Sequence, residues 1–221
     1  MGIPRAKAPV VRVAALLCPA GKDPDALLGE LGRIWGPPSA VSAPVDFVFT
    51  RFYEREMGPG LVRLFAAFAE PAPAEDLRAW KIASNALEAR HSRGGARRFN
   101  VDPGYLDMGT VVVASVKDAP QRVYVGDGIY AQPMLRFESG SFAAWPWTYP
   151  DYASPAAIGF FNAVREGYRA AARGRSGPAA PAGAAPVLPR ILCGPGRASP
   201  QRGPHALPRH RDSRRDFPDG F

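Results

Sequence analysis

The pattern of apolar and polar residues predicts that the chain opens with a strand and then a helix. Residues Val10–Leu17 are mostly apolar without alternation and contain three valines, which is typical of a core strand. Asp23–Asp25 then supply an N-cap followed by a proline in the first helical turn. Apolar residues recur at helical spacing as far as Trp35, and Gly36–Pro38 predict the end of this helix.

A hairpin and a second helix are predicted next. Aromatic and polar side chains alternate over Val45–Glu56, which indicates a strand. A turn at Gly58–Gly60 follows, and the apolar segment Leu61–Phe68 predicts the returning strand. Start signals at the beginning of Pro73–Arg90 open the clearest helix in the chain, and Gly94–Gly95 end it.

The following forty or so residues predict an antiparallel meander. Its strands are Arg97–Val101, Thr110–Lys117, Arg122–Val125 and Ile129–Glu138. The sequences DPG, KDAPQ and GDG between them are typical of turns. Pro133 cannot donate to a strand ladder, so it indicates a sheet edge or a β-bulge. With a closing amphipathic helix over Ile158–Ala172, the sequence predicts an α+β fold: a single mainly antiparallel sheet with helices packed on one face.

Charge and composition divide the chain of 221 residues into two parts. Its net charge is +8, and residues 173–221 contain nine arginines against three aspartates. This segment is rich in proline and glycine and has few apolar side chains, so no core can offset the entropy of ordering it. We expect a disordered tail over 173–221 behind a globular α+β domain over 8–172; a basic arm for nucleic acid is the alternative.

Several function classes find little support in the sequence. Two cysteines are too few for a disulfide framework, and the apolar run near the start is too short for a signal peptide. No segment reaches the roughly 18 apolar residues of a membrane helix. We therefore expect a cytoplasmic protein without a membrane partner. Phosphate-binding glycine loops, nucleophile elbows and zinc motifs are absent from the sequence, so no cofactor is expected.

Polar side chains align on two of the predicted elements. On the second helix, Lys81, Asn85 and Glu88 share a stripe beside the apolar face. On the meander, strand alternation collects apolar residues on one face and polar residues on the other. The polar face carries Arg98, Asn100, Asp102, Ser115, Lys117, Arg122, Tyr124, Tyr130, Gln132, Arg136 and Glu138.

The polar face has more cations than carboxylates, which indicates an anionic ligand. Arginine and lysine suit phosphate and carboxylate groups, and arginine matches their geometry with two parallel hydrogen bonds. Two plainer interpretations stay open. In the first, the polar face is the solvated side of an ordinary antiparallel sheet. In the second, the helical stripe is an exposed ion pair between Lys81 and Glu88.

Five motifs occur in a fixed order over about residues 8–172. They are FTRFYEREMGPGLVRLF (Phe49–Phe65), KIASNALE (Lys81–Glu88), RRFNVDPGYL (Arg97–Leu106), VVASVKDAPQRVYVGDGIYA (Val112–Ala131) and WTYPDY (Trp147–Tyr152). Taken together they resemble an uncharacterised prokaryotic family, domain of unknown function 4416. The resemblance singles out Tyr53, Glu56, Gly58, Lys81, Asn85, Glu88, Arg98, Asn100, Asp102, Gly104, Lys117, Arg122, Tyr130 and Asp151.

The chain departs from the family pattern at two positions. Gln121 stands where the resemblance leads us to expect a histidine, and Gln132 where a glutamate usually follows Ile-Tyr-Ala. A glutamine side chain forms hydrogen bonds but does not exchange protons near neutral pH. The two glutamines therefore argue against acid–base catalysis in this chain.

These observations predict a site for a phosphate- or carboxylate-bearing small ligand on the polar face of the sheet. Glu56 and Glu88 are the candidate catalytic or metal-binding carboxylates. The candidate ligand-binding residues are Lys81, Asn85, Arg98, Asn100, Asp102, Lys117, Arg122 and Tyr130. The alternative is a non-catalytic module that binds protein or RNA through the same face or through the aromatic loop 145–152. The residues are compatible with an enzyme or with a binding protein.

Overall fold

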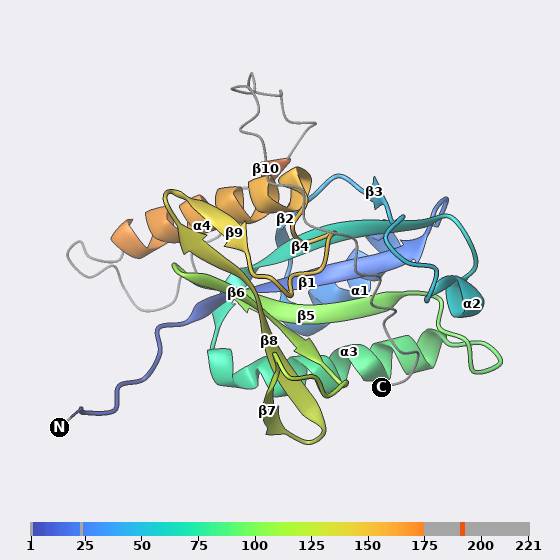
Figure 1. Cartoon of the computed structure of the whole chain (residues 1–221), viewed down its shortest axis with the longest axis horizontal. Coiled ribbons are helices and arrows are strands. Elements are labelled where there is room, and N and C mark those ends of the chain that lie inside the picture. Colours follow the sequence, from blue (N-terminus) through green and yellow to red (C-terminus); the bar gives the residue numbers. More distant parts are fainter. Residues whose placement is uncertain (1, 23, 175–190, 193–221) are drawn as a thin grey trace, which may run out of the picture.

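One mainly antiparallel sheet organises the protein (Figure 1), whose computed structural model describes residues 2–22, 24–174 and 191–192. The elements are β1 (Val10–Pro19), α1 (Pro24–Trp35), β2 (Pro38–Val41), β3 (Val45–Asp46), α2 (Glu54–Met57), β4 (Leu61–Ala72), α3 (Leu77–His91), β5 (Asn100–Leu106), β6 (Thr110–Ser115), β7 (Val123–Gly126), β8 (Ile129–Glu138), β9 (Ser141–Ala144), α4 (Pro155–Gly174) and β10 (Ile191–Leu192). The main strand order is β10-β2-β4-β1-β5-β6-β8-β7, with β3 beside β4 and β9 beside β8. Within the described ranges, only β10 and β2 pair in parallel.

Helices cover both faces of the sheet. Ala14 and Leu16 of β1 belong to the core beneath α1 and α3, whereas Val13 and Ala15 belong to the core beneath α4 with Phe160. Figure 1 shows α3 and α4 on opposite sides of the sheet. The α+β architecture is thus confirmed, but the expectation of helices on one face is wrong. The central strand β1 lacks polar alternation because both of its faces are buried.

Most of the predicted elements are confirmed. The first strand and the first helix appear as β1 and α1, and the returning strand as β4, which extends to Ala72. The second helix appears as α3 after a 3-10 turn over Ala74–Asp76. The last meander strand is β8 with the predicted bounds, and the closing helix is α4.

The predicted strand over Val45–Glu56 is wrong for most of its length. Only Val45 and Asp46 pair with β4. The chain then turns away, and the hydroxyl of Thr50 accepts a hydrogen bond from the backbone N–H of Phe52 at 3.1 Å, an arrangement that competes with strand pairing. The short helix α2 follows. Alternation misled here because the rings of this loop contact one another, as Phe47 contacts Tyr53, and pack against Leu17 and Leu61 without strand pairing.

The predicted turn at Asp102-Pro103-Gly104 is also wrong, because these residues lie inside β5. The turn between β5 and β6 instead forms at Asp107, whose Oδ1 accepts the backbone N–H groups of Gly109 and Thr110 at 2.8 and 2.7 Å. Gly104 is needed for close packing rather than for a turn. A Cβ at this position would lie 2.2 Å from the carbonyl oxygen of Val112 in the neighbouring strand.

Pro133 marks a β-bulge in β8, as predicted. Val111 pairs with Leu135 whereas Val112 pairs with Pro133, so one residue of β8 is extra. The extra residue reverses the alternation beyond the bulge. Arg136 and Glu138 consequently leave the face that Gln132 occupies, and pair with each other at 2.8 Å. β9, which pairs with β8 beyond the bulge, was not predicted.

The predicted tail over 173–221 lies almost wholly outside the described residues. Of its later part only Ile191–Leu192 are described, as the strand β10 beside β2. Over residues 2–22, 24–174 and 191–192, no helix combines the length and the apolar character needed to cross a membrane.

We predict that Gly104→Ala strongly destabilises the fold. The new methyl group meets backbone rather than a flexible side chain, so β5 and β6 must separate where they pair, at a cost of about 3 kcal/mol. Urea denaturation measures the loss. Gly109→Ala is the matched control, since a Cβ there has only ordinary contacts. Equal stability of the two variants would contradict the role given to Gly104.

Candidate functional site

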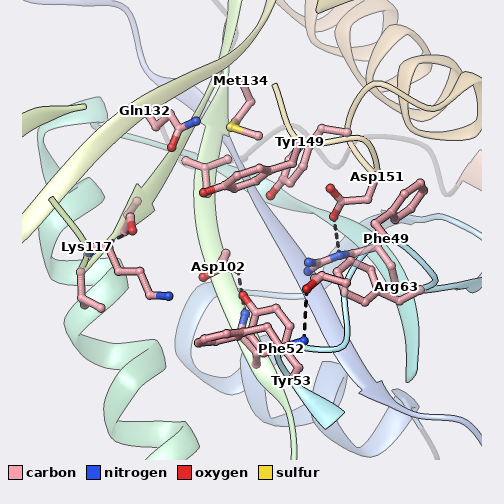
Figure 2. Close-up of a pocket in the computed structure, with 18 of the residues that line it drawn as sticks. Phe49, Phe52, Tyr53, Arg63, Asp102, Lys117, Gln132, Met134, Tyr149 and Asp151 are labelled. Atoms are coloured by element: carbon pink, nitrogen blue, oxygen red, sulfur yellow. Dashed lines mark hydrogen bonds and ion pairs between the residues drawn. The ribbon is translucent and has the colours of Figure 1, made fainter. Parts of the chain in front are cut away.

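A cavity of about 500 Å³ lies where β5 separates from β6 (Figure 2). β5 stays paired with β1 as far as Asn100, but its ladder with β6 in the described structure covers only Gly104–Leu106. Asn100 and Asp102 of β5 therefore line one side of the cavity, and Ser115 and Lys117 line another. The loops before α2 and before α4 complete the walls with aromatic side chains.

Lys81 of α3 reaches into the gap between the two strands. Its ammonium donates to the carbonyl oxygen of Val101 and to Oδ1 of Asp102, both at 3.0 Å, and the residue is only 4% exposed. Burial alone would raise the pKa of the Asp102 carboxyl, but the charges of Lys81 and Arg63 outweigh that effect and lower it. Asp102 is therefore ionised at neutral pH, and its ion pair with Lys81 ties α3 to β5.

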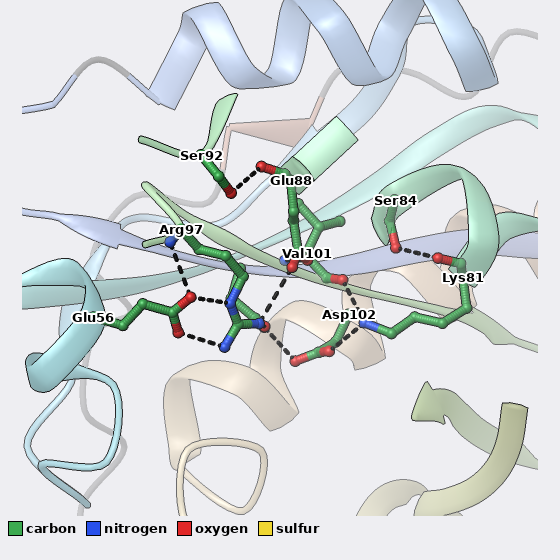
Figure 3. Close-up of polar contacts among 9 residues, drawn as sticks. Glu56, Lys81, Ser84, Glu88, Ser92, Arg97, Val101 and Asp102 are labelled. Carbon is green, nitrogen blue, oxygen red and sulfur yellow. Dashed lines mark hydrogen bonds and ion pairs between the residues drawn. The ribbon is translucent and has the colours of Figure 1, made fainter. Parts of the chain in front are cut away.

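Arg97 joins the segment before β5 to α2 and α3 (Figure 3). Its guanidinium forms a two-pronged contact with Glu56, with Nε at 2.8 Å from Oε1 and Nη2 at 2.7 Å from Oε2. The Nη1 group donates to Glu88 at 3.2 Å and to the side-chain oxygen of Asn100 at 2.8 Å. Asn100 in turn donates to Asp102 at 2.7 Å, so the network continues to the Lys81 pair.

The two glutamates differ in protonation behaviour although both contact Arg97. The hydrogen bonds from Arg97 lower the pKa of Glu56. Burial raises the pKa of Glu88, only 5% exposed, against the opposing charge of Lys81. The remaining Glu88 oxygen accepts the backbone N–H of Val101 at 2.7 Å. The carboxylates of both residues are thus engaged with Arg97 and backbone, and neither residue lines the cavity.

A second buried ion pair forms the far wall. Arg63 of β4 lies 2.8 Å from Asp151 of the loop before α4, and both residues are about 95% buried. The guanidinium also stacks over the ring of Phe47, 5.1 Å from its centre. Burial alone would lower the pKa of Arg63, but Asp151, Tyr152, Asp102 and Tyr53 together outweigh that effect and raise the pKa. The hydroxyl of Tyr152 beside this pair is buried as well, which raises its pKa far above the ordinary value.

Two further cations at the cavity are not neutralised. In the part of the chain that the structure describes, neither Lys117 nor Arg122 forms an ion pair. Arg122 is held by neutral oxygens only: it donates to the Gln132 side chain at 2.7 Å, to the backbone carbonyl of Lys117 at 2.6 Å and to the hydroxyl of Tyr149 at 2.5 Å. Its position is therefore fixed while its charge stays available.

Aromatic rings border the cavity. Phe49, Phe52 and Tyr149 are large rings that remain substantially exposed, whereas Tyr53 is more buried. Burial raises the pKa of Tyr53 to about 12, so its hydroxyl stays protonated at neutral pH. Figure 2 shows Phe52 and Tyr53 near Asp102, and Phe49 near Arg63.

The structure brings together most of the predicted ligand-binding residues. Those that line the cavity are Lys81, Asn85, Asn100, Asp102, Lys117 and Arg122. Arg98 does not line it, because the strand begins only at Asn100 and the alternation counted back to Arg98 does not hold outside the strand. Tyr130 packs on Tyr124 instead, with ring centres 5.3 Å apart.

The predicted catalytic or metal-binding use of Glu56 and Glu88 stays a prediction, and the geometry gives it little support. Both carboxylates contact Arg97 outside the cavity lining. No cluster of three or more His, Cys, Asp or Glu side chains suited to a metal ion occurs within the described residues. Their contacts instead indicate that the two glutamates position Arg97 and, through it, Asn100.

Sequence reasoning missed other residues of the cavity. Arg63 and Arg97 were not candidates. Tyr149 was considered only as part of the aromatic loop, and Asp151 was singled out by the resemblance without a role. A signal was present for Arg63, since it interrupts the apolar run of Leu61–Phe68 and a buried arginine requires an acidic partner. No local pattern reveals that partner, because Asp151 lies in a loop distant in sequence.

Comparisons with known proteins identify one relationship. A protein-family model described as a domain of unknown function, DUF4416, matches residues 9–168. No curated protein and no solved structure matches the chain.

We predict that Glu56→Gln lowers stability in a pH-dependent way. Because the pKa of Glu56 is lower in the folded protein than its ordinary value of 4.5, ionised Glu56 stabilises the fold. This contribution is complete at pH values above the ordinary pKa and is lost as the pH falls through the lowered pKa. Since the pair is partly exposed, we expect a cost of about 1–2 kcal/mol at pH 7 that shrinks toward pH 3.5, measured by urea denaturation. Glu54→Gln in the same helix is the control, and a cost independent of pH would contradict the assignment.

Proposed function

The chain belongs to the family described as domain of unknown function 4416, and we propose that it binds a phosphate- or carboxylate-bearing small molecule in the cavity between β5 and β6. The observation that carries this proposal is the state of the cations. Arg63, Lys81 and Arg97 are each neutralised by a carboxylate. Lys117 and Arg122 have no such partner among the described residues, so their charges are available to an anion.

The surroundings of Arg122 support an anion-binding role. An arginine held by neutral oxygens keeps its full charge and loses little conformational freedom on binding, because its position is fixed beforehand. The oxygens of Gln132, Lys117 and Tyr149 hold it in this way. Guanidinium N–H groups that remain can donate to a phosphate or carboxylate oxygen in charge-assisted hydrogen bonds.

The charge of the whole lining points in the same direction. Five cationic side chains line the cavity. Asp151, Asp102 and Glu56 neutralise three of them, and Lys117 and Arg122 remain in excess among the described residues. The excess of positive charge in a partly enclosed space attracts anions more strongly than the same charges on an open surface, because low-dielectric walls focus the field.

The concave shape favours a small ligand over the alternative of a protein- or RNA-interaction module. A volume of about 500 Å³ lies within the range of small-molecule and cofactor sites. The polar residues converge on this space rather than spreading over a flat sheet face, because α4 covers the remainder of that face. In this proposal Glu56 and Glu88 act as positioning residues through Arg97.

We predict that Gln132→Glu weakens anion binding about tenfold or more. The substitution keeps the shape of the side chain and places a carboxylate 2.7 Å from the Arg122 guanidinium, which neutralises it. The amide nitrogen of Gln132 has no hydrogen-bond partner among the described residues, so its replacement leaves no acceptor among them without a donor. Titration with inorganic phosphate, followed by the rise in melting temperature, measures the affinity.

A second pair of variants removes a positive charge inside the cavity, in Arg122→Ala, or from a residue that does not line it, in the control Arg98→Ala. Arg122→Ala is expected to weaken phosphate binding as Gln132→Glu does, whereas Arg98→Ala leaves it unchanged. The proposal fails if phosphate binds the native protein and Gln132→Glu equally well, or if Arg98→Ala is as harmful as Arg122→Ala.

A further inference from the structure

Resting on the proposed anion site, we infer that its ligand is a phosphate ester carried on a planar ring, with nucleoside monophosphates as the representative class. The inference comes from what the two available cations touch. The ammonium of Lys117 lies 4.3 Å from the centre of the Phe52 ring. The guanidinium of Arg122 donates to the hydroxyl of Tyr149. Each un-neutralised cation is therefore in contact with an aromatic side chain of the same cavity.

The two rings are unusually exposed for their size. Phe52 is 58% exposed and Tyr149 is 45% exposed, although both line the cavity. They come from different segments, Phe52 from the loop before α2 and Tyr149 from the loop before α4. A planar group that enters between these loops would cover aromatic surface now in contact with solvent, which favours binding.

The cations and rings of the cavity fit a molecule that carries both a phosphate and a planar ring. Lys117 and Arg122 are separate cations on neighbouring segments, and a phosphate has enough oxygens to accept from both. The rings of Phe52 and Tyr149 adjoin these cations directly. Base–aromatic stacking is tolerant of base identity and contributes substantially to affinity.

A polar floor lies within the same cavity. Asn85, Asn100 and Asp102 line it, and the side-chain amide of Asn85 makes no hydrogen bond with any described residue. Amide and carboxylate groups can bind the hydroxyls of a sugar that links the ring to the phosphate. The volume of about 500 Å³ accommodates all three parts within the range known for cofactor sites.

The test compares ligands that share a phosphate and differ in the ring. The four ribonucleoside 5′-monophosphates, ribose 5-phosphate, the four nucleosides and inorganic phosphate are each titrated into the full chain by calorimetry. We expect at least one nucleoside monophosphate to bind about tenfold or more tightly than ribose 5-phosphate, since stacking on a ring is worth that much. We expect each nucleoside without its phosphate to bind more weakly than its monophosphate.

Two variants assign the effect to the ring. Phe52→Leu keeps an apolar side chain but removes the aromatic face, so the nucleoside monophosphate should lose most of its advantage while ribose 5-phosphate binds as before. Val48→Ala is the matched control, because Val48 lies on the same loop, is 80% exposed and does not line the cavity. Melting temperatures of both variants confirm that they fold.

The outcomes separate the two proposals. If ribose 5-phosphate and every nucleoside monophosphate bind equally, the ring inference is wrong and the anion site stands. If neither these phosphates nor inorganic phosphate binds, both proposals are wrong. If the ring advantage persists in Phe52→Leu, or disappears equally in Val48→Ala, the assignment to Phe52 is overturned.

Discussion

The separation of β5 from β6 is the constraint on which the rest of the site depends. At Gly104 the two strands approach so closely that no side chain fits. Immediately before Gly104 in the chain, at Asp102 and Pro103, β5 no longer pairs with β6. Strands that part inside a sheet leave backbone groups without ladder partners, a cost that other groups must offset. Lys81 from α3 does so by donating to the carbonyl of Val101, and Glu88 by accepting its N–H. The cavity exists because a helix, rather than the next strand, satisfies this stretch of backbone.

The charged residues around the cavity fall into two groups with different physical roles. Arg63, Lys81 and Arg97 are neutralised by carboxylates and connect elements that are distant in sequence. The buried pairs of Arg63 and Lys81 contribute little net stability but fix geometry, since removal of one partner leaves an unpaired charge in a medium of low dielectric constant. Lys117 and Arg122 lie at the same cavity without carboxylate partners in the described structure. The first group builds the walls, and we assign the binding of ligand to the second.

Sequence reasoning recovered most of the elements and placed several residues that line the cavity, and its failures share a cause. Alternation placed Asn100 and Asp102 on one face of a strand, and helical spacing placed Lys81 and Asn85 on one stripe; the structure brings all four to one cavity. Local periodicity failed where the chain leaves regular structure, so Arg98 was preferred to Arg97. It also failed for Asp102-Pro103-Gly104, where a turn signal reflects close packing of neighbouring strands, a contact that no local pattern encodes.

The most direct measurement is a crystal structure of the full chain grown with inorganic phosphate. The account predicts a phosphate ion inside the cavity, within hydrogen-bond distance of both Lys117 Nζ and the Arg122 guanidinium, with Gln132 still accepting from Arg122. A cavity without phosphate, in crystals where the ion occupies Arg98 or other surface arginines, would contradict the central claim.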